Sequence, residues 1–192
     1  MRASLGRKIL VTGGVRSGKS YFALELARGY PSPRIFLATA EAFDDGMRAR
    51  IRAHQQERGP DFITLEAPQN LAEKIADLKT EPGIILVDCM TLWVNNLIYD
   101  GAGDYSGMQE KVNAWIGFVQ NFPGDMIFVT NEIGLGVMPE NELSRQFIDE
   151  LGALNRKLAE IADEVILMVA GIPQWMKGVR QNADLASKST GR

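Results

Sequence analysis

The segment from Gly13 to Ser20 constrains the fold more than any other part of the chain. It reads Gly-Gly-Val-Arg-Ser-Gly-Lys-Ser, which is a glycine, four residues and then Gly-Lys-Ser, the pattern of a phosphate-binding loop. The apolar run Ile9–Val11 precedes it, and Tyr21–Arg28, with helical periodicity, follows it. Because such a loop joins a strand to a helix, these flanks predict nucleotide binding.

The residue types in this loop suit a polyphosphate ligand. Glycines let the backbone amides turn inward around the phosphates, and the helix N-terminus adds its dipole and unpaired N–H groups. Lys19 can reach the β- and γ-phosphates, and the Ser20 hydroxyl can hold Mg²⁺. The predicted phosphate-binding residues are Gly13, Gly14, Val15, Arg16, Ser17, Gly18, Lys19 and Ser20.

The remaining sequence alternates between apolar runs and segments with helical periodicity. The runs predict strands at Lys8–Thr12, Arg34–Ala40, Asp61–Glu66, Ile84–Asp88, Met126–Thr130 and Val165–Ala170. Helices are expected at Lys19–Arg28, Asp44–Glu57, Leu71–Leu78, Leu92–Tyr99, Met108–Phe122 and Glu142–Ala162, with a flexible loop at Gly101–Gly107. This alternation predicts a three-layer α/β domain of the P-loop NTPase type with a mainly parallel sheet. We expect one domain over residues 1–192, with a core of about 8–177 and a loose polar tail over 178–192.

Composition narrows the class of protein. The net charge of −3 does not indicate a broad surface for nucleic acid or anionic membrane. The sequence predicts no membrane span and no signal peptide, and a cytoplasmic protein is the simplest interpretation. Cys89 is the only cysteine, so no intrachain disulfide can form, and we expect a buried thiol rather than a nucleophile.

Asp88 ends the apolar run Ile84–Val87. This pattern places one carboxylate at the binding edge of the sheet, where it can act on Mg²⁺ directly or through water. The alternative is an aspartate that caps the following helix. The phosphate-binding loop favours the metal role.

His54 is the only histidine in the chain. It shares a helical face with Met47 and Ile51, which is also the pattern of a partly buried core residue. Arg50 and Arg58 lie four residues before and after it. Two guanidinium groups would disfavour protonation of the imidazole and could grip phosphate oxygens, which suits attack on phosphorus but also a solvated charged stripe.

Polar residues also follow the fifth predicted strand, at Thr130-Asn131-Glu132. With Gly134 and Gly136 after them, they indicate a substrate loop, although an ordinary turn before the next helix would need similar residues. Glu132 is a candidate base for phosphoryl transfer from its position alone.

Several blocks together resemble one family, the bifunctional adenosylcobinamide kinase / adenosylcobinamide-phosphate guanylyltransferases of cobalamin biosynthesis. The resemblance covers Ile9 to about Gly171 and rests on five blocks: Leu10–Ser20, Leu37–Ala40, Asp44–His54, Asp88–Leu92 and Val129–Asn141. Generic phosphate-loop kinases do not carry the last of these.

The resemblance implies two reactions. A nucleoside triphosphate, ATP or GTP, phosphorylates the hydroxyl of adenosylcobinamide, and GTP then transfers GMP to adenosylcobinamide phosphate through a GMP-histidine intermediate. The guanylylated histidine falls on His54. The resemblance also implies Mg²⁺ and a homotrimer.

The resemblance also implies nucleotide-binding roles for further residues, according to their positions. The nucleotide-contacting positions of the family fall on Thr39, Ala40, Glu41, Gln55, Gln56, Glu57, Arg58, Glu66 and Asp88, and the candidate Mg²⁺ ligands are Ser20 and Asp88. Asp88 stands where family members have Glu, so its shorter reach leaves open a direct or a water-mediated contact. Two other hypotheses stay open: a small-molecule kinase without guanylyltransferase activity, and a nucleotide-binding regulatory module.

Overall fold

The computed structural model describes residues 5–41, 55, 58–100 and 105–178. Its strands are β1 (Lys8–Gly13), β2 (Arg34–Ala38), β3 (Ile63–Glu66), β4 (Ile84–Asp88), β5 (Met126–Val129), β6 (Glu164–Val169) and β7 (Ile172–Lys177). Its α-helices are α1 (Lys19–Arg28), α3 (Leu71–Ala76), α4 (Met90–Asp100), α5 (Tyr105–Asn121) and α6 (Glu142–Ile161), and two short 3₁₀ helices lie at Gly59–Asp61 and Ile133–Leu135. None of the described helices combines the length and the apolar character needed to cross a bilayer.

The strands form one sheet in the order β3-β2-β4-β5-β1-β6-β7. All neighbours pair in parallel except β6 and β7, which pair antiparallel. The predicted α/β class with a mainly parallel sheet is confirmed. Strand β5 lies between β1, which leads into the phosphate-binding loop, and β4, which ends at Asp88. Since the carboxyl ends of parallel strands meet at one edge, this order brings both motifs to the same edge.

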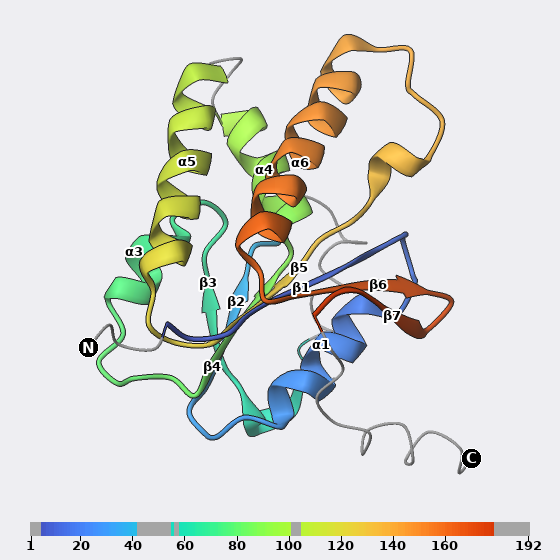
Figure 1. The fold of residues 1–192 in the computed structure, drawn as a ribbon. Coiled ribbons are helices and arrows are strands. Elements are labelled where there is room, and N and C mark those ends of the chain that lie inside the picture. The colour runs from blue at the N-terminus through green and yellow to red at the C-terminus, as the bar shows by residue number, and fades with distance from the viewer. Residues whose placement is uncertain (1–4, 42–54, 56–57, 101–104, 179–192) are drawn as a thin grey trace.

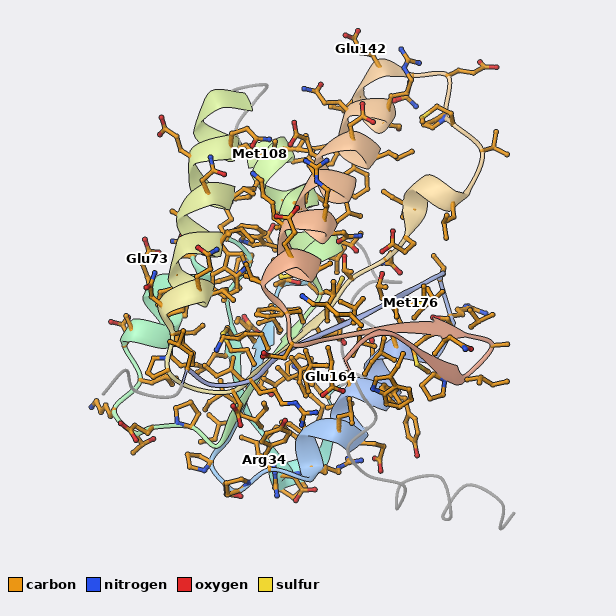
Figure 2. All side chains as sticks on the ribbon, in the orientation of Figure 1. Arg34, Glu73, Met108, Glu142, Glu164 and Met176 are labelled. Carbon is orange, nitrogen blue, oxygen red and sulfur yellow. The ribbon has the colours of Figure 1, made fainter. Side chains whose placement is uncertain are left out.

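The helices cover both faces of the sheet (Figure 1). Helix α1 lies on one face and α4, α5 and α6 lie on the other. Each face has its own apolar cluster: Val11 and Ile127 pack with Ala23 and Leu24 of α1, whereas Leu10 packs with the cluster that includes the buried residues of α3 to α6. Figure 2 shows Glu142 at the end of α6 farthest from the sheet and Glu164 where the chain has returned to it.

Most predicted elements are present, with shifted ends. Helix α1 and strand β4 have the predicted bounds, and α4 and α5 begin two and three residues earlier than predicted. Strand β3 starts at Ile63, not at Asp61, because Gly59, with φ +62°, and Pro60 begin a 3₁₀ helix that ends at Asp61. The predicted loop at Gly101–Gly107 is wrong from Tyr105 onward, where α5 begins; residues 101–104 lie outside the described part.

Strand β7 was not predicted. The prediction ended β6 at Ala170, but Ala170 and Gly171 have φ of +51° and +81° and form a two-residue turn between Val169 and Ile172. Positive φ at both central residues is the geometry of a type I′ hairpin turn, which usually carries Asn-Gly or Asp-Gly. Because the sequence here is Ala-Gly, it indicated this hairpin turn only weakly. The predicted helix at Asp44–Glu57, apart from Gln55, and the tail beyond Gly178 lie outside the described residues.

Candidate nucleotide site

The phosphate-binding loop owes its path to two glycines. Gly13 ends β1 with φ +147°, and a Cβ there would lie 2.4 Å from the carbonyl oxygen of Met168 on β6. Gly18 has φ +91° and occupies the N-cap of α1. Both conformations disfavour residues with a side chain. The loop between them therefore opens at the N-terminus of α1, where backbone N–H groups can bind an anion.

Lys19 folds back onto this loop. Its Nζ donates to the carbonyl oxygen of Gly14 at 2.5 Å and to Oγ of Ser17 at 3.4 Å, and its side chain is buried. Burial lowers the pKa of Lys19, and the nearby Cys89 and Asp88 oppose that shift. A buried ammonium held by a carbonyl and a hydroxyl is stabilised further when an anion binds beside it, because the anion offsets its lost hydration.

The β6–β7 hairpin supports the loop from behind. The N–H of Gly171 donates to the carbonyl oxygen of Ser17 at 3.0 Å. On the next strand, Trp175 packs edge-on against Phe22 of α1, with ring centroids 6.2 Å apart, and its Nε1 donates to Oε2 of Glu164 at 3.0 Å. The unpredicted strand thus contributes to holding the loop and the first turn of α1.

A cavity of about 870 Å³ opens beside the loop at the carboxyl edge of the sheet. It joins residues from β2, β3, β4 and the segment after β5 to the start of α1. Among the residues singled out from the sequence it is lined by Val15, Arg16, Ser17, Gly18, Lys19, Ser20, Ala40, Glu41, Gln55, Arg58, Glu66, Asp88 and Asn131. Its size suits a ligand of nucleotide dimensions.

Thr39 lies beneath this cavity rather than on its wall. It is fully buried, and its hydroxyl donates to the carbonyl oxygen of Cys89 at 2.8 Å and accepts from the N–H of Cys89 at 2.7 Å. The amide of Asn96 on α4 donates to the carbonyl oxygens of Thr39, at 2.8 Å, and of Pro68, at 3.0 Å. These contacts fix the ends of β2 and β4, where the Asp88–Cys89 peptide bond is cis.

Arg58 is a buried cation within the cavity wall. Its guanidinium carbon lies 3.8 Å from the centroid of the Phe36 ring, and its Nε has no hydrogen-bond partner among the described residues. Burial lowers the pKa of Arg58, and attraction from Asp88 opposes this. A guanidinium that stacks on an aromatic ring and has an unpaired Nε donor is suited to an anionic ligand.

The segment after β5 carries a hydrogen-bond network that the sequence analysis missed in part. Asn155 of α6 is buried; it accepts from Oγ1 of Thr130 at 2.7 Å and donates to the carbonyl oxygen of Asn131 at 3.0 Å. Oε1 of Glu132 accepts from Oγ1 of Thr12 at 2.7 Å and from Nδ2 of Asn155 at 3.3 Å. An asparagine within the apolar stripe of a long helix is the signal that could have pointed to this network.

The Cys89 thiol is partly buried, and desolvation, together with Asp88, raises its pKa to about 12. The prediction of a fully buried thiol is wrong, because Cys89 is among the residues that line the cavity. The raised pKa disfavours the reactive thiolate, and the absence of a nucleophilic role stays a prediction.

Comparison with known proteins decides the family. The family model described as cobinamide kinase / cobinamide phosphate guanyltransferase matches residues 9–176. The bifunctional adenosylcobalamin biosynthesis protein CobU of Escherichia coli K12 is 42% identical over 176 residues, covering 85% of this chain and 96% of that protein. The bifunctional adenosylcobalamin biosynthesis protein CobP of Pseudomonas aeruginosa is 40% identical over 170 residues, covering 88% and 96%. This chain belongs to the cobinamide kinase / cobinamide phosphate guanyltransferase family. The predicted family and the predicted bifunctional transferase are thereby confirmed.

One solved structure supports the fold alone. A protein of Pyrococcus horikoshii OT3, PH0250, aligns with a TM-score of 0.54 at 13% identity, covering 93% of this chain and 89% of that one.

Most of the residues that the family resemblance assigns to nucleotide binding lie together in the structure. Ala40, Glu41, Gln55, Arg58, Glu66 and Asp88 line the same cavity as the phosphate-binding loop. Gly13, Gly14 and Thr39 are not among its lining residues. His54, Gln56 and Glu57 lie outside the described residues. The nucleotide contacts themselves stay predictions.

Proposed function

We propose that this cavity holds the nucleoside triphosphate for both reactions of the family, phosphorylation of adenosylcobinamide and transfer of GMP to adenosylcobinamide phosphate. One observation supports this proposal above others. The loop residues Val15–Ser20 and the four residues Gln55, Arg58, Glu66 and Asp88, which come from separate parts of the sequence, line one cavity. The resemblance assigns all of them to nucleotide binding, although only the loop has a recognisable phosphate motif.

The residues present fit a magnesium ion. Ser20 and Asp88 line the cavity and offer a hydroxyl and a carboxylate oxygen, and Mg²⁺ in such sites is held by one or two protein oxygens, phosphates and water. The described residues contain no cluster of three or more aspartate, glutamate, histidine or cysteine side chains that could hold a metal ion. When bound, Mg²⁺ would neutralise charge on the phosphate oxygens.

In the kinase step, the substrate hydroxyl attacks the γ-phosphorus and the bond to the β-phosphate oxygen breaks, which releases the nucleoside diphosphate. The loop amides and Lys19 stabilise the charge on the leaving diphosphate. To do so, Nζ of Lys19 would exchange its hydrogen bond to the carbonyl oxygen of Gly14 for one to a phosphate oxygen. Glu132, whose Oε1 is held by Thr12 and Asn155, is the candidate acceptor of the hydroxyl proton.

In the guanylyltransferase step, a ring nitrogen of His54 attacks the α-phosphorus of GTP. A P–N bond forms, the α–β bridging bond breaks and pyrophosphate leaves. A phosphate oxygen of adenosylcobinamide phosphate then attacks the same phosphorus, and imidazole leaves with its proton restored. The product is adenosylcobinamide-GDP. The loop and Arg58 would carry the negative charge of the leaving pyrophosphate.

The test is transfer of label from GTP. With Mg²⁺ and GTP labelled at the α-phosphate, the wild-type protein should retain label that is labile to acid and stable to alkali. Mapping by mass spectrometry should find GMP on His54, and His54→Ala should keep its circular dichroism spectrum and lose the label. Label on folded His54→Ala, or none on wild type, would remove the histidine mechanism. Phosphorylation of cobinamide without any self-labelling would instead support a kinase alone.

The family resemblance and the composition add three further expectations. We infer a homotrimer, which sedimentation equilibrium can check; an active monomer would contradict it. We infer that the enzyme acts in the cytoplasm. We also infer that its partners are small molecules, adenosylcobinamide and its phosphate, rather than nucleic acids.

A further inference from the structure

Asn131 is held at three points. Its backbone N–H and its side-chain Nδ2 both donate to Oγ1 of Thr91, each at 3.0 Å. Its carbonyl oxygen accepts from Nδ2 of Asn155 at 3.0 Å. Asn131 and Thr91 both line the nucleotide cavity, whereas Asn155 is buried behind them. Holding a side chain in one orientation through such supporting hydrogen bonds is how proteins preset a contact with a ligand.

The side-chain amide of Asn131 turns its Nδ2 toward Thr91. Oγ1 of Thr91 accepts from this Nδ2 and from the backbone N–H of the same residue. Nδ2 carries two protons and Thr91 takes one of them. In the described part of the chain the second proton has no acceptor, so a donor is left for a ligand.

The position of Asn131 indicates which part of a ligand it would meet. The N–H groups of Thr130 and Glu132 donate to the carbonyl oxygens of Val11, at 3.0 Å, and Gly13, at 3.2 Å. Asn131 therefore lies beside the start of the phosphate-binding loop. Because β5 lies between β1 and β4, it also lies on the path from that loop to Asp88. Ser20 and Asp88, the residues that would hold Mg²⁺, line the same cavity, and a nucleotide whose phosphates start at the loop would bring its terminal phosphate toward Asn131.

We propose that Asn131 is a ligand-contacting residue that distinguishes nucleoside triphosphates from diphosphates: its second Nδ2 proton donates to the terminal phosphate, with Thr91 and Asn155 as positioning residues. The inference rests on the proposed nucleotide site. A hydrogen bond to a charged phosphate that is made only by the triphosphate changes the affinity for one nucleotide and not the other.

The test compares two nucleotides by titration calorimetry with Mg²⁺. The parent is His54→Ala, which stops guanylyl transfer during the measurement. On this parent, Asn131→Ala should weaken binding of the β,γ-imido analogue of GTP by about tenfold or more and change binding of GDP by less than about twofold. Asn113→Ala is the matched control, because Asn113 is an exposed asparagine on α5 that pairs with Lys157. It should change neither.

A second pair of variants tests the inference if Asn131→Ala does not fold. Thr91→Val removes the acceptor that aims Asn131 and should show the same selective loss, whereas Thr91→Ser keeps the oxygen and should bind like the parent. Equal loss for both nucleotides, or no loss, would overturn the inference and leave the nucleotide site standing. A folded parent that binds neither nucleotide would overturn the proposed site, and this inference with it.

Discussion

The hydroxyl of Thr39 holds both sides of the Cys89 backbone: it donates to the carbonyl oxygen at 2.8 Å and accepts from the N–H at 2.7 Å. Thr39 directly follows β2 and Cys89 directly follows β4, so one side chain couples the ends of two neighbouring strands at the edge of the nucleotide cavity. We expect these two bonds to help fix the end of β4, which carries Asp88.

Replacing Thr39 by valine should therefore destabilise the protein. Valine keeps the shape but leaves the N–H of Cys89 without its partner and removes one of two hydrogen bonds to the Cys89 carbonyl, which also accepts from the N–H of Trp93. The unpaired N–H costs about 1–3 kcal/mol in free energy of unfolding. Urea unfolding followed by circular dichroism measures this. Thr39→Ser keeps the hydroxyl and should lose less than half as much. Equal losses in the two variants would show that the methyl group, not the hydrogen bonds, matters.

Lys19→Met should separate stability from binding. In the folded protein burial lowers the pKa of Lys19 below 10.5. Between the two pKa values the folded state binds fewer protons than the unfolded state, so the contribution of Lys19 to stability rises with pH through that window. At pH values below this window, the buried ammonium lowers the free energy of unfolding. The methionine variant should thus be at least as stable as wild type at pH 7, by up to about 1 kcal/mol, and this advantage should shrink toward pH 10.

The same variant should lose triphosphate binding, since Lys19 is the cation aimed at the β- and γ-phosphates. Calorimetry with the β,γ-imido analogue of GTP should show at least about a hundredfold weaker binding. A variant that is clearly less stable than wild type at pH 7 would contradict the assignment of a buried, poorly compensated charge.

Cys89 should resist alkylation. With the pKa of the thiol raised to about 12, only about one molecule in 10⁴ carries the thiolate at pH 8, against roughly a quarter for an unperturbed thiol. Iodoacetamide labelling followed by mass spectrometry should be about a thousandfold slower than in urea, and its rate should rise about tenfold for each pH unit beyond pH 9. A rate that levels off near pH 9 would show an ordinary thiol.

The strands and the loop could be predicted from the sequence because their signals are local. Buried parallel strands appear as continuous apolar runs, as in Ile84–Val87, and the phosphate-binding loop is a contiguous motif. The ends of elements depend on contacts with distant residues. Strand β2 stops at Ala38, two residues before the predicted end, where Thr39 turns its hydroxyl to Cys89.

The polar network of the site could not be predicted because its partners are remote in sequence. Asn155 is separated from Asn131 by 24 residues and from Thr130 by 25, and Asn96 from Thr39 by 57. Only the order of strands brings them together. Arg58 could be named from the family, but its stacking on Phe36 requires the fold.

The hairpin of β6 and β7 should matter to the phosphate-binding loop that it supports. Trp175→Ala removes the contact with Phe22 and the hydrogen bond to Glu164, and should lower the free energy of unfolding by about 1–3 kcal/mol. The control is Met176→Ala on the same strand, since Met176 is 64% exposed and should change stability by less than about 0.5 kcal/mol. Thermal unfolding of both variants tests this. A similar loss in the two would mean that strand β7, rather than the Trp175 contact, carries the effect.

The two glycines that open the loop should differ sharply when each is replaced by alanine. At Gly13 a Cβ would lie 2.4 Å from the carbonyl oxygen of Met168 and would sit on a backbone with φ +147°. Relief requires β1 and β6 to move apart, so Gly13→Ala should lose about 2–4 kcal/mol or fail to fold. At Gly14 a Cβ would meet nothing within 4 Å among the described residues. Gly14→Ala should stay within about 1 kcal/mol of wild type in urea unfolding. Equal stability of the two variants would show that β6 yields at Met168, and that the Gly13 conformation is not fixed by the sheet.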